Sequence, residues 1–166
     1  RDAKIKSEVF LTEYELGTIA VLCDLILPAD GSYKAASDAD VADFIEFIVK
    51  DIESYKMPIR GGLMWLDNFS NEKFNLAFQA CSEEQQKSIL DLIAYPESEP
   101  SDLAPGIEFF SLVRNLTLTG FYTSKIGIEE LGYKGNTPNV WDGVPDEVLK
   151  KHGFAYDENI QYVDQS

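Results

Sequence analysis

Apolar residues recur every three or four positions in the first part of the chain, which is the period of an amphipathic helix. Thr12 and Glu15 have the spacing of a capping box, and the apolar pattern that follows them ends at Pro28. These signals predict a helix over about residues 13–27, with apolar positions on most of its sides. Asp24 is the only charged residue in its later turns.

The next segment, residues 29–37, is rich in Gly, Ser and Asp and is predicted to be a loop. Ser37 or Asp38 can then cap a second helix, because both are strong N-cap residues. The apolar face of this helix runs to Ile52, and acidic residues and a lysine lie on its other face.

Helical spacing continues through two further apolar sets, residues 63–69 and residues 74–81. Ser82 and Gln85 form a second capping box. The helix that starts there is predicted to end before Pro96, since proline cannot continue a helix.

An acidic segment with three prolines, residues 95–105, is predicted to be a surface loop. The most apolar stretch follows, and it predicts a central helix over about residues 106–122. A short helix over residues 124–131 comes next, and Gly132 closes it.

From Tyr133 on, Gly, Pro, Asn and Asp are dense and the apolar period is lost, apart from one helical turn near residues 146–151. Val, Ile and Thr do not alternate at period two, so a sheet is not supported. The predicted fold is all-α, a compact helical domain of about five to six helices. Its expected parts are an N-terminal extension (1–10), the helical domain (11–135) and an irregular C-terminal arm (136–166).

The charge balance excludes some partners. The 166 residues include 29 Asp and Glu against 14 Lys and Arg, for a net charge of −15. Such a chain repels phosphate backbones and anionic lipids, so nucleic acid is not an expected partner. The longest apolar run, Ile19–Cys23, is far shorter than the roughly 20 residues that cross a bilayer, so no membrane span is expected.

Cysteine and histidine are scarce. Cys23, Cys81 and His152 cannot supply a four-ligand zinc site or an iron–sulfur cluster, and no Cys-x-x-Cys-His sequence could attach a haem. Both cysteines fall on apolar stripes of the helical pattern, which favours buried thiols over a disulfide. No glycine-rich motif for a dinucleotide or a triphosphate occurs.

Five acids cluster along the first loop and its flanking helices: Asp24, Asp30, Asp38, Asp40 and Asp43. Their spacing does not match an EF-hand, and helix capping by Asp38 and Asp40 explains most of the cluster better than a Ca²⁺ site or a carboxylate pair. Asp24 is the exception because it stands in an apolar helix. A structural hydrogen bond to it is favoured over catalysis.

Arg114 is the other polar residue in an apolar helix. It could bind a carboxylate or phosphate of a ligand. An internal ion pair with Asp24 or Asp43, or a hydrogen bond to a loop carbonyl, is the commoner outcome. We therefore interpret Asp24, Asp30 and Arg114 as structural polar residues.

Tyr122, Ser124 and Lys125 invite a catalytic interpretation, but their offsets do not match the Tyr–Lys or Ser–Lys arrangements of known enzymes. Ser124 is better explained as a helix cap. His152 lies in the polar tail without a nucleophile motif beside it. No catalytic, cofactor-binding or metal-binding residue is predicted on this chain.

Three stretches of the chain resemble the gluconate 2-dehydrogenase subunit 3 family, also called the gamma or small subunit: Leu11–Asp30, Asp38–Val49 and Phe109–Tyr133. The resemblance covers roughly residues 11–135. Its most specific part resembles the phenylalanine-pair and Tyr-x-Ser signature of the family, carried here by Phe109, Phe110, Arg114, Gly120, Tyr122, Ser124, Gly127, Gly132 and Tyr133.

Members of this family are small exported partners of a large FAD-dependent dehydrogenase of the glucose–methanol–choline type. The complexes oxidise sugars or sugar acids and often include a cytochrome c subunit. The resemblance implies a non-catalytic subunit, periplasmic or membrane-associated through its partners, that assists twin-arginine export, stability or assembly of the flavoprotein. FAD and haem c would be carried by the partner subunits.

Such a subunit acts through its surface. We expect the partner to bind the segment from Tyr122 to Tyr133, including Ser124 and Lys125, and the tail around Trp141. Packing of Tyr122 and Tyr133 on their own helices is the alternative for these two rings. The alternatives for the whole chain are an acidic binding module for Ca²⁺ and a small stand-alone enzyme that uses Asp24, Asp30 and Arg114.

Overall fold

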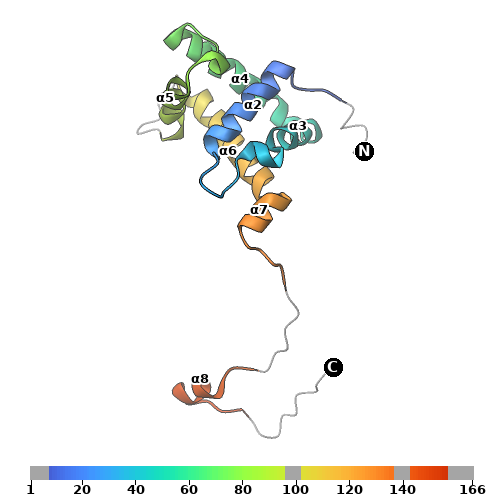
Figure 1. The fold of residues 1–166 in the computed structure, drawn as a ribbon, viewed down its shortest axis with the longest axis vertical. Helices are drawn as coiled ribbons and strands as arrows, with labels where there is room; N and C mark the ends of the chain where they lie inside the picture. The colour runs from blue at the N-terminus through green and yellow to red at the C-terminus, as the bar shows by residue number, and fades with distance from the viewer. Residues whose placement is uncertain (1–7, 96–101, 137–142, 157–166) are drawn as a thin grey trace. The chain divides into compact units, whose positions relative to one another are not determined.

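The computed structural model describes residues 8–95, 102–136 and 143–156. The chain divides into two compact units, residues 1–133 and residues 134–166. The described residues contain seven α-helices and two 3₁₀ turns (Figure 1), which are α2 (Glu13–Ile26), η1 (Ala36–Ala39), α3 (Val41–Asp51), α4 (Glu53–Phe74), η2 (Phe78–Ala80), α5 (Glu83–Ala94), α6 (Ala104–Thr123), α7 (Lys125–Glu130) and α8 (Asp146–Lys151). No strand occurs among these residues, only an isolated bridge between Asp30 and Tyr33. The all-α prediction is confirmed.

Helix α6 is the centre of the first unit, as its apolar sequence predicts. It contacts α2, α3, α4, α5 and α7 (Figure 1). Val113, Thr117 and Phe121 of α6 are almost completely buried. A helix that is enclosed on most sides does not need a broad polar stripe. This explains why apolar residues of this segment lie on several of its faces and are not confined to one.

Both predicted capping boxes are present. The Thr12 hydroxyl accepts a hydrogen bond from the Glu15 N–H at 3.2 Å, and the Glu15 carboxylate accepts one from the Thr12 N–H at 2.8 Å. Ser82 and Gln85 repeat this exchange at the start of α5. Each pair satisfies two backbone donors that a helix N-terminus leaves free, which is why the sequence places these starts correctly.

The predicted helical set over residues 74–81 is wrong. Helix α4 ends at Phe74, because Asn75 adopts a left-handed backbone with φ 56°. The Phe78 N–H then bonds to the Asp67 carboxylate at 3.0 Å instead of to a helical carbonyl. Phe78 and Cys81 are buried through a single 3₁₀ turn, so their helical spacing reflects burial and not a helix.

The start of the second helix also differs from the prediction. Residues 36–39 form a 3₁₀ turn, and α3 begins only at Val41. Between the two, Asp40 adopts a left-handed backbone with φ 50°. Asp38 caps the 3₁₀ turn, where its carboxylate accepts from the Ala35 N–H at 2.8 Å.

In the second unit, α8 spans the single turn that the sequence predicts. The Phe154 N–H bonds to the Leu149 carbonyl at 2.9 Å, and Gly153 ends the helix with φ 76°. The Val144 N–H donates to the Tyr156 hydroxyl across this short loop. No residue of α8 is buried.

Candidate functional site

The junction of α6 and α7 holds most of the residues that we predict to bind a partner. Ser124 has an extended backbone, and its N–H bonds to the Phe121 carbonyl at 3.0 Å. Its hydroxyl accepts from the Gly127 N–H at 3.1 Å, so Ser124 is the N-cap of α7, as predicted. The Ser124 side chain is thus engaged in holding the turn.

Gly127 allows α7 to fold closely onto the end of α6. A Cβ atom at this position would lie 2.1 Å from the Phe121 carbonyl oxygen, which no side chain can tolerate. The family signature residue Gly127 is therefore explained by backbone contact. The angle between the two helices depends on it.

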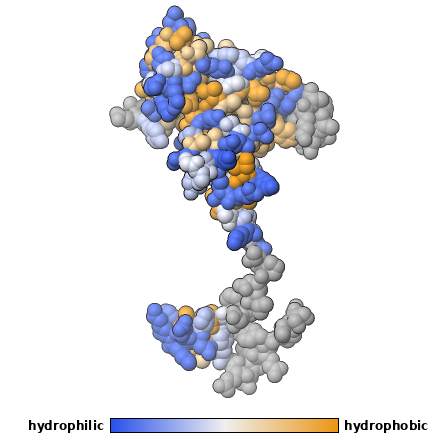
Figure 2. Space-filling view, in the orientation of Figure 1, coloured by the Kyte–Doolittle hydropathy of each residue, from blue (hydrophilic) through white to orange (hydrophobic). Residues whose placement is uncertain are grey.

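Five apolar side chains from the later part of α6, from α7 and from the residues just after it are exposed, and we call them the α6–α7 surface: Leu118, Tyr122, Ile128, Leu131 and Tyr133. Leu118 and Tyr122 lie one turn apart on α6, and Leu131, the C-cap of α7, lies three residues after Ile128. Figure 2 shows apolar residues exposed over α7. Tyr133 is 68% exposed and Leu131 61%, so solvent reaches most of both side chains.

A tight helix end fixes the backbone of Tyr133. Gly132 has φ 62°, its N–H bonds to the Glu129 carbonyl at 3.0 Å, and the Tyr133 N–H bonds to the Ile128 carbonyl at 3.2 Å. These two hydrogen bonds form the Schellman motif. The motif is frequently accompanied by a contact between the side chains at the positions that Ile128 and Tyr133 occupy here. A fixed backbone with an exposed aromatic ring is typical of an interface anchor.

The sequence leaves two interpretations open for Tyr122, which are partner binding and packing on its own helix, and the structure has features of both. The Tyr122 ring meets the buried Phe121 ring edge-on, with centroids 5.2 Å apart, yet the residue is 37% exposed. Lys125 is mostly solvent-exposed, and its Nζ lies 3.8 Å from a carboxylate oxygen of Glu129. Trp141 lies outside the described residues. Partner binding by these residues stays a prediction.

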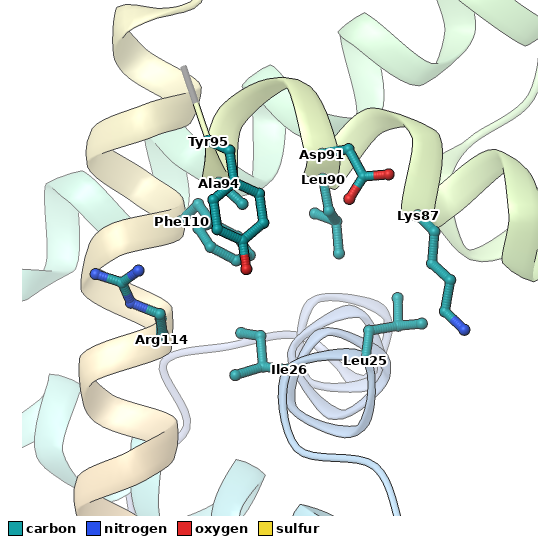
Figure 3. A pocket seen from close by; sticks show the side chains of 9 residues that line it. All are labelled: Leu25, Ile26, Lys87, Leu90, Asp91, Ala94, Tyr95, Phe110 and Arg114. Carbon is teal, nitrogen blue, oxygen red and sulfur yellow. The ribbon is translucent and has the colours of Figure 1, made fainter. Parts of the chain in front are cut away.

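Arg114 lines a groove of about 310 Å³ between α2, α5 and α6. Figure 3 shows Arg114 at one margin and Asp91 and Lys87 at the other. The apolar residues of this groove are Leu25, Ile26, Leu90, Ala94 and Phe110. The sequence does not reveal it, because three separate helices supply its walls.

The expected ion pair of Arg114 with Asp24 or Asp43 is wrong. Arg114 is exposed and makes no hydrogen bond or ion pair with any residue in the described ranges. The physical reason is its orientation, since Arg114 lies beside α5, while Asp43 lies at the start of α3 and lines a different groove. Asp24 is already engaged elsewhere.

Asp24 makes the structural hydrogen bond that we predict. Its carboxylate accepts from the Ser37 N–H at 2.8 Å and so joins α2 to the 3₁₀ turn. Asp30 contributes through its backbone, which pairs with Tyr33 at 3.2 and 2.9 Å. The capping role expected of Asp40 is wrong, because its side chain makes no cap hydrogen bond.

The positions of these acids and of Arg114 support neither the Ca²⁺-binding module nor the stand-alone enzyme. Among the residues that the structure describes, no group of three or more His, Cys, Asp or Glu side chains could hold a metal ion. Asp24 and Asp30 are not among the residues that line the Arg114 groove. The three residues of the stand-alone enzyme hypothesis thus do not meet in the Arg114 groove.

Both cysteines are free and buried, as predicted, although Cys81 follows a 3₁₀ turn instead of lying in a helix. The Thr117 hydroxyl donates to the Val113 carbonyl at 2.8 Å and contacts the Cys23 sulfur at 3.3 Å. Burial raises the pKa of Cys23 to about 11, and the nearby Asp24 carboxylate adds to the shift. This thiol is therefore held protonated and unreactive.

None of the described helices combines the length and the apolar character that a bilayer crossing requires.

A family model described as Gluconate 2-dehydrogenase subunit 3 matches residues 13–143. The matched range runs from the first residue of α2 through α7 and includes the whole α6–α7 surface. No curated protein and no solved structure matches the chain.

Proposed function

Because the chain belongs to the gluconate 2-dehydrogenase subunit 3 family, we propose that it is a non-catalytic accessory subunit of a dehydrogenase complex that oxidises sugars or sugar acids. The family match over residues 13–143 is the observation that carries this proposal. The large subunit is an FAD-dependent enzyme of the glucose–methanol–choline type, and a cytochrome c subunit accepts its electrons. The complex works in the periplasm.

The role of this chain is then to bind and stabilise the flavoprotein. The α6–α7 surface supports such a role, since it presents two tyrosines and three aliphatic side chains to solvent from a rigid helical frame. Tyrosine is among the commonest anchors of protein interfaces, because its ring buries a large area and its hydroxyl tolerates water.

Binding of a folded partner also explains the proposed part in export and assembly. A subunit that binds only the folded flavoprotein stabilises that fold by mass action. A folded complex could then leave the cytoplasm through the twin-arginine route as one particle.

The test is to co-express the tagged chain with the large FAD-dependent dehydrogenase subunit of the same organism. We expect a flavin-containing chain of larger size to co-purify. We also expect dehydrogenase activity in the periplasm to be lost when this chain is deleted. A flavoprotein that is exported and active to the same extent without the chain would contradict the proposal.

A further inference from the structure

A second groove, of about 410 Å³, lies between α2 and the start of α3. Its apolar lining consists of Leu16, Gly17, Ala20, Cys23, Val41 and Ala42. The α2 members follow one face of the helix, and most of them are small, so another chain can come close to the α2 backbone. This volume is within the range of about 300–1,000 Å³ that is typical of binding clefts.

Specific contacts hold the walls of this groove in place. The hydrogen bond from the Ser37 N–H to the Asp24 carboxylate, 2.8 Å long, fixes the 3₁₀ turn against α2. On the floor, Cys23 contacts Thr117 of the central helix at 3.3 Å. The groove is therefore part of the folded unit and does not need a ligand to form it.

The groove carries uncompensated negative charge. Glu13, Asp40 and Asp43 line it, and no Lys, Arg or His does. Within the described residues, none of these three carboxylates has a salt bridge or a side-chain hydrogen bond. By contrast, Glu46 has Lys50 at 3.4 Å on the same α3 helix.

Asp40 shows that this charge is not needed for the fold. The residue has a left-handed backbone, which glycine or asparagine would adopt with less strain, and its carboxylate does not cap α3. Asp43 is in the first turn of α3, where the helix dipole favours it by only about 0.3–1 kcal/mol. Three carboxylates around an apolar floor match a ligand with apolar and cationic groups.

We propose that this groove receives a cationic amphipathic helix of the large dehydrogenase subunit. One or two apolar side chains of that helix occupy the floor, and its Lys or Arg side chains lie opposite Glu13, Asp40 and Asp43. The identity of the partner rests on the proposed function, whereas the chemistry of the bound helix rests on the groove. Apolar burial supplies affinity, and the charges supply orientation and a salt-dependent association rate.

The first experiment uses the full chain and two fluorescent helical peptides of equal length, one built from Leu and Lys and the other from Leu and Glu. Fluorescence anisotropy should show binding of the Leu/Lys peptide alone, weaker at high salt. The variant Glu13→Gln/Asp40→Asn/Asp43→Asn should bind it about tenfold more weakly, since three screened charge pairs are lost.

A matched control separates the groove from the general negative charge of the chain. The variant Glu72→Gln/Asp91→Asn/Glu108→Gln removes the same number of charges from exposed positions outside the groove. It should keep the affinity of the unmodified chain within about twofold. Equal losses in the two triple variants would overturn the proposal, as would binding of the Leu/Glu peptide or no binding of the Leu/Lys peptide.

The apolar floor is tested without changing any charge. Ala20→Phe should fill the groove and weaken peptide binding about tenfold, while Met64→Phe at an exposed position of α4 should not. Circular dichroism and thermal melting check that both variants are folded. Unchanged binding by a folded Ala20→Phe variant would contradict the proposal.

Co-purification distinguishes a failure of this inference from a failure of the proposed function. If the flavoprotein co-purifies equally with the unmodified chain and with the groove triple variant, the accessory role stands and the groove proposal falls. If no flavoprotein binds the unmodified chain, the proposed function falls, and the peptide result decides the groove by itself. Self-association of the chain that the groove variants abolish would overturn the proposal in favour of a second copy.

Discussion

Gly62 of α4 lies directly against the ring of Phe109 of α6. A Cβ atom at Gly62 would be 2.0 Å from that ring. The contact has a reciprocal partner, since a Cβ at Gly106 of α6 would be 2.3 Å from the ring of Trp65 of α4. On each helix a glycine thus packs against an aromatic ring of the other helix, and these two contacts allow α4 and α6 to lie close together.

The first prediction tests this contact. Gly62→Ala should lower the free energy of unfolding by about 1–3 kcal/mol, because the added methyl group must displace the Phe109 ring in a packed core. Gly61→Ala is the matched control, since nothing lies within 4 Å of a Cβ there. It should raise stability by about 0.5–1 kcal/mol, because alanine favours the helix. Urea unfolding of the two variants gives both values, and equal effects would refute the packing argument.

The second prediction concerns two buried hydroxyls. The Ser70 hydroxyl is buried without a hydrogen-bond partner among the described residues, whereas Thr117 donates to Val113 and contacts Cys23. Ser70→Ala should therefore be neutral or slightly stabilising, and Thr117→Val should destabilise by about 1 kcal/mol. Thermal or urea unfolding measures both. A larger loss for Ser70→Ala than for Thr117→Val would show that Ser70 has a partner in solution.

The third prediction is a pH dependence at the first capping box. Burial alone would raise the pKa of Glu15, but hydrogen bonds from Thr12 and Arg60 outweigh it and hold the pKa below 4.5. The ionised form is thus favoured by folding, so this stabilisation is present above about pH 4.5 and is lost as the pH falls through the lowered pKa.

Glu15→Gln keeps the capping geometry but removes the charge. We expect it to be less stable than the unmodified chain by about 0.2–1 kcal/mol at pH 7, and the difference to shrink as the pH falls through the lowered pKa of Glu15. Urea titrations at pH 7 and at successively lower pH values measure the difference. In an Arg60→Ala background, the difference at pH 7 should shrink, because Arg60 Nε lies 3.2 Å from Glu15.

The fourth prediction concerns thiol reactivity. Cys23 is 1% exposed and its pKa is about 11, so it should resist a disulfide-exchange reagent at pH 8 in the folded state and react rapidly in urea. A Cys81→Ala variant isolates this thiol. Rapid modification of Cys23 in the folded variant would show that local opening of the packing between α2 and α6 exposes the thiol.

The fifth prediction tests the α6–α7 surface. Tyr122→Ala and Tyr133→Ala should each reduce co-purification with the flavoprotein, with a cost of about 1–2 kcal/mol in binding if the rings are anchors. Tyr133→Ala should barely change the melting temperature, because the ring is mostly exposed. Tyr95→Ala, at the C-cap of α5, is the control and should bind normally, because this tyrosine is also exposed but lies outside the α6–α7 surface.

The outcomes at particular residues show which parts of the site a linear pattern can predict. Ser124 is predicted as a cap and is one, because its partner Gly127 is three residues away. Arg114 is predicted to form an internal ion pair and does not, because its surroundings come from α2 and α5. The acids Asp40 and Asp43 are noted in the sequence as a cluster, but their place beside an apolar groove is visible only when α2 and α3 meet.

The sequence alone determines the all-α class, both capping boxes, the central place of α6 and the single turn of α8, since each depends on residues within a few positions of one another. It also carries the family signature. The tertiary structure alone decides which glycine meets which ring, where Arg114 lies, and that three carboxylates with no partner in the described part of the chain lie around an apolar groove. These features depend on the faces by which distant helices pack, and the period of a helix does not encode which neighbour each face will meet.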